Sequence, residues 1–139
     1  MVKTSPILRD SKWLLSRLDH IWSDYFPDVK QKNKVFIRFG RNSRFRLGSI
    51  RFDKRSGNSI ITLTGIFRKD NLPLEVIDHT IAHELCHYTH GFSSPRPRLH
   101  KYPHHGGVIK KELISRGLGH LVKMYRNWIR QYRKTFIYA

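Results

Sequence analysis

The sequence of 139 residues has a single cysteine, Cys86, so the chain cannot form an internal disulfide. It has no apolar run close to the roughly 20 residues that a membrane-spanning helix needs. The first ten residues also lack the long apolar core of a secretory signal. These absences favour a cytoplasmic protein that is kept in a reducing compartment and has no membrane partner.

Acidic residues are scarce as well. Ten Asp and Glu stand against 27 Lys and Arg, which gives a net charge of +17. The excess is concentrated in residues 30–55, with ten basic residues and one acid, and in residues 96–139, with eleven and one. Such an excess points to a polyanionic partner. It predicts non-specific DNA binding through both segments and a nucleoid- or DNA-associated location, and a merely solvated basic surface is the alternative.

Hydrophobic residues make up 39% of the chain and aromatic residues 12%, which is enough for a single folded domain over residues 1–139. The pattern predicts an α+β fold with an N-terminal helix, a small three-stranded and mostly antiparallel sheet, and three further helices, the last two of them C-terminal. A slip in the alternation near Gly48 suggests a β-bulge. The predicted helices are 6–26, 74–90, 105–117 and 118–136, and the predicted strands are 35–39, 45–52 and 60–64.

The strongest chemical signal is the run His83-Glu84-Leu85-Cys86-His87, which has the pattern H-E-x-x-H. Residues four apart share one face of a helix, so His83 and His87 can both bind a single metal ion. Glu84 lies about 100° round the helix from His83, where its carboxylate can act as general base on a metal-bound water. The alternative is an ordinary buried helix in which each histidine has its own hydrogen bond.

The predicted helix carries two further histidines, His79 and His90, on the same side as the motif. Of the pairs of neighbouring histidines on this helix, only His83 and His87 have a glutamate directly after the first histidine. His79 and His90 are therefore expected at the helix surface or in a position that supports the site. A catalytic zinc needs a third ligand from elsewhere. His105 at the start of the next helix can point across at the motif, and His104 can do the same if that helix begins one residue earlier. The candidates for third ligand are His90, His100, His104, His105 and His120.

The motif, followed by His105-Gly106-Gly107-Val108-Ile109, resembles the SprT-like zinc metallopeptidases (the SprT/Spartan-type domain), with the YgjP-type metal hydrolases as near relatives. The resemblance extends over about residues 35–115, although Ile109 stands where the family has an aromatic residue and the four-cysteine zinc ribbon is missing. It implies a zincin-like fold whose helix over residues 74–90 is the metal-binding helix, with one zinc ion bound by His83, His87 and His105 and with Glu84 as the base. It also implies protein substrates, several of which are bound to DNA in family members.

Together these features predict a zinc metallopeptidase that acts on DNA-associated proteins. Two alternatives stay open: a nucleic-acid-binding module with a structural or vestigial metal site, and a metal hydrolase with a non-peptide substrate. Cys86 lies within the motif and flanks the site, and as a fourth zinc ligand it would close the coordination position that catalysis needs. A packed, unreactive thiol is therefore expected.

Overall fold

A computed structural model describes residues 8–101, 104 and 107–137. This part of the chain is an α+β fold with four α-helices and one small sheet, which confirms the predicted class. No helix among the described residues combines the length and the hydropathy needed to cross a bilayer. The elements in order are α1 (Ser11–Tyr25), β1 (Val35–Phe39), β2 (Gly48–Asp53), β3 (Asn58–Leu63), the short 3-10 helix η1 (Gly65–Arg68), α2 (Leu74–Thr89), α3 (Val108–Ser115) and α4 (Gly119–Ile137).

The sheet is mixed, with strand order β1-β3-β2, so the prediction of a mostly antiparallel sheet is wrong. β3 pairs in parallel with β1 and antiparallel with β2. The reason is the segment 40–47, which carries the chain across the end of β3. There the Gly40 N–H donates to the Leu63 carbonyl at 2.7 Å, and the Gly65 N–H donates to the Arg41 carbonyl at 3.0 Å. β1 and β2 are therefore held apart, and β3 fills the place between them.

The predicted bulge near Gly48 is also wrong, because β2 begins at this residue. Gly48 already pairs in regular register with Leu63, and residues 45–47 lie outside the strand. The slip in the sequence alternation therefore marks the end of the crossing segment 40–47, where the apolar spacing of a strand does not apply.

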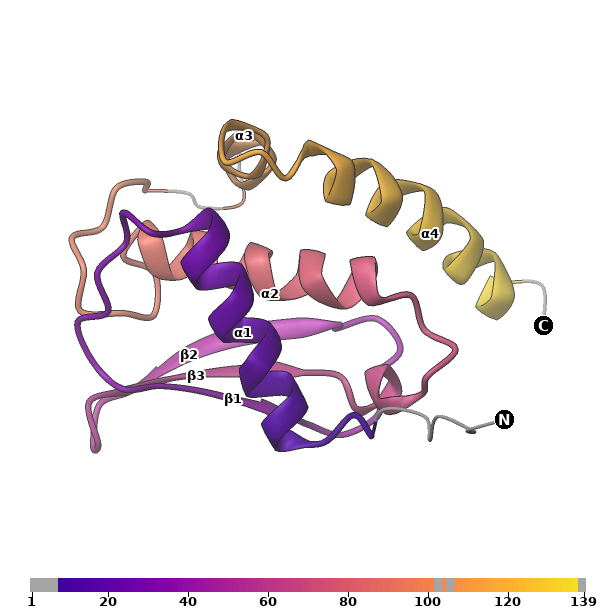
Figure 1. The fold of residues 1–139 in the computed structure, drawn as a ribbon, viewed down its shortest axis with the longest axis horizontal. Helices are drawn as coiled ribbons and strands as arrows, with labels where there is room; N and C mark the ends of the chain where they lie inside the picture. The colour runs from indigo at the N-terminus through magenta and orange to yellow at the C-terminus, as the bar shows by residue number, and fades with distance from the viewer. Residues whose placement is uncertain (1–7, 102–103, 105–106, 138–139) are drawn as a thin grey trace, which may run out of the picture.

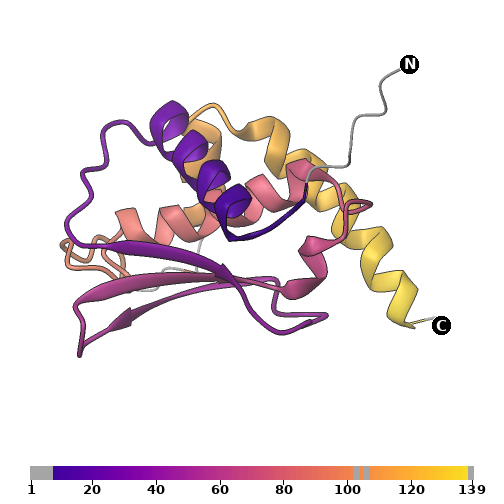
Figure 2. The same ribbon diagram turned by 60° about the horizontal axis from the view of Figure 1, so that its bottom comes forward.

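All four α-helices lie on one side of the sheet, as Figures 1 and 2 show. α1 packs on β1, whereas α2 packs on β2 and β3 and is covered on its outer side by α3 and α4. Because α2 lies between two layers, its polar residues are buried along with its apolar ones, including Asp78, His79, Glu84 and His87. The motif helix is therefore the centre of the molecule.

α1 begins at Ser11 and not at residue 6, the predicted start. The Asp10 side chain caps the helix by accepting a hydrogen bond from the Trp13 N–H at 2.9 Å. The helix is fixed to α2 by Arg17, which donates to both carboxylate oxygens of Asp78, at 3.1 and 2.7 Å. This two-point contact sets how the first helix crosses the motif helix.

α4 carries the long apolar stripe that its periodicity predicts. The stripe packs against α2, and its Trp128 ring contacts Phe67 of η1, while the opposite face presents basic side chains to solvent. The residues of the stripe are Leu121, Tyr125, Trp128, Ile129 and Tyr132.

Candidate metal centre

The two histidines of the motif meet at one point on α2. The Nε2 atoms of His83 and His87 are 3.2 Å apart, because residues one turn apart project their side chains from the same face. His87 is buried and His83 is partly exposed. The predicted pairing of these two imidazoles on one face is confirmed.

A third imidazole reaches the same point from the connection between α2 and α3. The His104 ring centroid lies 4.7 Å from that of His87. One ligand nitrogen from each of His83, His87 and His104 lies within 4.8 Å of the others, which is close enough for the three to hold one metal ion. His105, the predicted third ligand, lies outside the described residues. His104, the alternative at the neighbouring position, is the third histidine at the pair among the described residues.

The spacing and protonation of these groups fit a divalent cation. Two nitrogens bound to zinc at about 2.0–2.1 Å with tetrahedral angles are about 3.3 Å apart, close to the 3.2 Å between His83 and His87. Burial, with a smaller contribution from neighbouring histidines, lowers the pKa of His83 to about 4 and that of His87 to about 3. Both rings are therefore neutral at physiological pH, the form that binds metal. The buried Nδ1 of His87 has no hydrogen-bond partner among the described residues.

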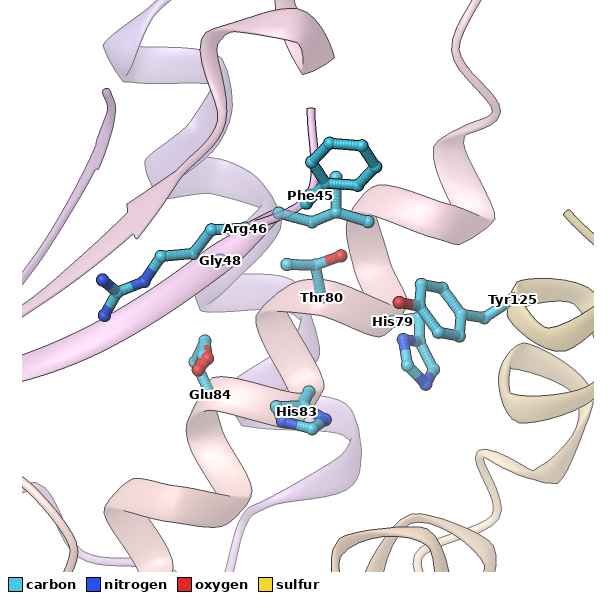
Figure 3. A pocket seen from close by; sticks show the side chains of 9 residues that line it. Phe45, Arg46, Gly48, His79, Thr80, His83, Glu84 and Tyr125 are labelled. Carbon is cyan, nitrogen blue, oxygen red and sulfur yellow. The ribbon is translucent and has the colours of Figure 1, made fainter. Parts of the chain in front are cut away.

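The side chain of Glu84 points toward Gly48 at the beginning of β2, next to His83 (Figure 3). Glu84 also lines a cavity together with His87 and His104. Its side chain lines two small cavities, of about 270 and 320 Å³, which also contain His83 and His87 respectively. Burial raises the pKa of Glu84 to about 7, and the positive charge of Arg46 opposes this rise. A carboxyl group with a pKa near neutrality can both accept and return a proton. The arrangement is therefore suited to acid–base chemistry on a molecule bound at the imidazoles.

Gly48 allows β2 to pass close to this carboxylate. A Cβ at Gly48 would lie 2.6 Å from Thr80 Cγ2 and 3.7 Å from Glu84 Cγ. Because Gly48 has no side chain, β2 can lie closer to α2 at the two cavities than any other residue at this position would allow.

We expect Gly48→Ala to lower the free energy of unfolding by about 1–3 kcal/mol, because the added methyl group forces β2 away from Thr80. Denaturant unfolding followed by circular dichroism measures this change. Gly119→Ala, at the start of α4, is the matched control, because the added Cβ would come no closer than 3.9 Å to Ile114. There alanine should be neutral or slightly stabilising. Equal stability of the two variants would contradict the close approach at Gly48.

The remaining histidines, His79 in α2 and His90 at its C-cap, stay out of the cluster and are buried. Of the two places expected for them, the helix surface is therefore wrong, and a supporting position beside the site remains. His79 stacks on Tyr125 of α4, with ring centroids 4.0 Å apart and planes 9° apart (Figure 3). Burial lowers the pKa of His79 to about 4. His90 Nε2 lies 2.7 Å from Glu112 Oε1 of α3. These two histidines connect α2 to α4 and α3, and so hold the layer that covers the site.

The other third-ligand candidates also lie elsewhere. The His100 ring is next to His90, at a centroid distance of 4.5 Å, and His120 is exposed on α4. Cys86 is fully buried in the apolar core, and burial raises the pKa of its thiol well above the ordinary value. The expectation of a packed thiol is confirmed.

Some residues of the site carry no recognisable signal in the sequence. Arg46 and Phe92 line the cavity that contains His87, and Tyr125 lines the cavity that contains His83. Tyr125 belongs to an apolar stripe that predicts core packing, and Arg46 is one of many arginines. Only the crossing segment 40–47 and the packing of α4 on α2 bring them to the motif.

Comparisons of this chain with protein-family models, with curated proteins and with solved structures found no match. The resemblance to SprT-like metallopeptidases therefore rests on the two sequence motifs, and the geometry of the site stands independently of it.

Proposed function

We propose that this protein is a zinc-dependent metallopeptidase of SprT-like type, with a zincin-like fold, and that it acts on DNA-associated proteins. The observation that supports this most is the convergence of His83, His87 and His104 beside the buried carboxylate of Glu84. Three imidazole nitrogens with a carboxylate alongside leave one coordination position for a water, as catalytic zinc sites require.

The residues have separate roles in this proposal. The three imidazoles hold the metal, which when bound polarises a carbonyl and acidifies water. Glu84 accepts the proton of the attacking water and returns it to the amine that leaves when the peptide bond breaks. Burial raises the pKa of Glu84, and the positive charge of Arg46 opposes part of that rise.

β2 offers a place for an extended substrate. β3 is paired on both sides, whereas no strand of the described residues pairs with the outer edge of β2. Gly48, the first residue of β2, lines both cavities at Glu84. A peptide that adds to this edge by main-chain hydrogen bonds would bring a scissile bond to the imidazoles.

Metal removal and return test the proposal. The purified protein should contain about one zinc ion per chain. It should cleave casein, or a protein bound to single-stranded DNA, and lose this activity on treatment with a chelator. Zinc should restore the activity because the ligands remain folded around the site. If the protein binds DNA but cleaves no peptide, the hypothesis of a nucleic-acid-binding module is favoured. If it holds zinc, cleaves no peptide and does not bind DNA, the hypothesis of a metal hydrolase with a non-peptide substrate is favoured.

A further inference from the structure

A large cavity lies away from the metal centre, between α4, η1 and the segment 40–47. It has a volume of about 710 Å³, within the usual range for ligand pockets. Trp128, Tyr132 and Phe136 supply its aromatic wall, and the first two rings stack with centroids 4.5 Å apart and planes 19° apart. We call this space the aromatic cavity. Such a wall offers stacking surface to a flat ring.

The rest of the lining of the aromatic cavity is polar and basic. Arg44 and Lys69 carry positive charge at its edge, and none of the described residues that line it is acidic. The Tyr132 hydroxyl is buried with no hydrogen-bond partner among the described residues. Amide side chains that can pair with the edge of a nucleobase come from Asn42, Asn71 and Gln131. The lining thus combines stacking surface, amide groups and positive charge, which together suit a nucleotide.

A second pocket, of about 300 Å³, opens on the outer face of the sheet. Its lining includes the side chains of Arg38, Arg41, Arg46 and Arg51, and we call it the arginine pocket. Within the described part of the chain, no carboxylate lies at salt-bridge distance from these four guanidinium groups, unlike those of Arg17 and Arg116. Hydroxyl groups that can also bind an anion come from Ser43, Ser49 and Thr62. An unpaired arginine cluster with hydroxyls around it suits phosphate groups.

One short segment forms a wall of both spaces. Within 40–47, Asn42 and Arg44 line the aromatic cavity, whereas Arg41, Ser43 and Arg46 line the arginine pocket. The segment is held in place by Thr64, whose hydroxyl donates to the Ser43 carbonyl at 2.7 Å and whose N–H donates to the Leu47 carbonyl at 2.8 Å. A base site and a phosphate site therefore lie on the two sides of one fixed loop.

We propose that single-stranded DNA binds across the segment 40–47, with its phosphates in the arginine pocket and one unpaired base in the aromatic cavity. A duplex would bind less well because its base faces are already stacked. Arg46 also lines both cavities of the metal centre, so a bound strand would lie beside Glu84 and bring an attached protein to it. The choice of DNA over RNA rests on the proposed function, but the binding site itself does not need a working peptidase.

Fluorescence anisotropy with three labelled ligands of equal length tests this proposal: oligo(dT), an abasic oligodeoxynucleotide and a DNA duplex. We expect oligo(dT) to bind tighter than the other two. Tyr132→Leu, which keeps bulk but removes the ring, should weaken oligo(dT) binding roughly 5- to 150-fold and leave the abasic strand unaffected. Asn71→Ala changes an exposed side chain of the same cavity and should weaken only oligo(dT) binding.

The triple variant Arg38→Gln, Arg41→Gln and Arg51→Gln should weaken binding of oligo(dT) and of the abasic strand alike. It should also reduce the slope of log affinity against log salt by about 2, because each lost phosphate contact on a single strand contributes about 0.7. The matched control replaces Arg55, Lys110 and Lys111, three exposed cations that line neither space. The control should keep most of the salt slope and the full preference for oligo(dT).

Zinc content and casein cleavage without DNA should be unchanged in the Tyr132, Asn71 and triple-arginine variants, which separates this proposal from the proposed function. The proposal is overturned if duplex or abasic DNA binds as tightly as oligo(dT), or if the folded Tyr132 and Asn71 variants keep the preference. It is also overturned if the control triple variant loses as much of the salt slope as the arginine triple variant. Tighter binding of oligo(U) than of oligo(dT) would overturn the assignment to DNA.

Discussion

Glu84→Gln is expected to leave zinc bound and the protein folded while lowering peptidase activity by about 10²- to 10⁴-fold. The amide has nearly the shape of the carboxylate, but it cannot accept a proton from the attacking water. Glu84 is only 4% exposed and has no role as a metal ligand in the proposal, so its replacement should not disturb the three imidazoles. Steady-state cleavage of a peptide substrate, together with zinc analysis of the same preparation, measures both quantities.

The matched control is Glu75→Gln, in the first turn of the same helix and more than two turns from Glu84. Glu75→Gln should keep full peptidase activity. Its free energy of unfolding should fall slightly, because a negative charge at the helix N-terminus is removed. If Glu84→Gln cleaves peptides as fast as the natural sequence, the carboxylate is not the general base.

Single replacements of the three clustered histidines should each weaken zinc binding by more than about 100-fold, because loss of a direct ligand costs more than loss of a supporting contact. His104→Ala is the informative case, since His104 is the third imidazole placed at the pair. His105→Ala is expected to keep its zinc. Competition with a coloured chelator measures the affinities.

His120→Ala is the control for this series, because His120 is exposed on α4 and is not part of the cluster. It should bind zinc as tightly as the natural sequence. If His105→Ala loses zinc and His104→Ala keeps it, the third ligand is the one that the family resemblance implies, and the peptidase proposal survives with that change. If both variants keep full affinity, the site has no third ligand in this connection.

The sequence predicts the local elements well because their signals are local. Helix spacing places His83 and His87 on one face at any tertiary arrangement, and the apolar stripe of α4 follows from the same periodicity. The order of the strands in the sheet was predicted wrongly, because it depends on contacts between segments that are far apart in the chain. Three short strands with turns between them suit an antiparallel meander, and only the hydrogen bonds between Gly40 and Leu63 and between Gly65 and Arg41 show that the chain crosses over β3.

What the sequence determined by itself is therefore a pair of imidazoles with a carboxylate at fixed helical spacing, and a strong positive charge. The tertiary structure brought His104 to the pair, and it decided how closely Gly48 approaches Glu84. It also decided that one loop forms a wall of two spaces of different chemistry. The physical reason is that helical spacing depends on neighbouring residues, whereas these contacts join segments far apart in the chain. Their positions are set by which faces pack together, and no short stretch of sequence encodes that.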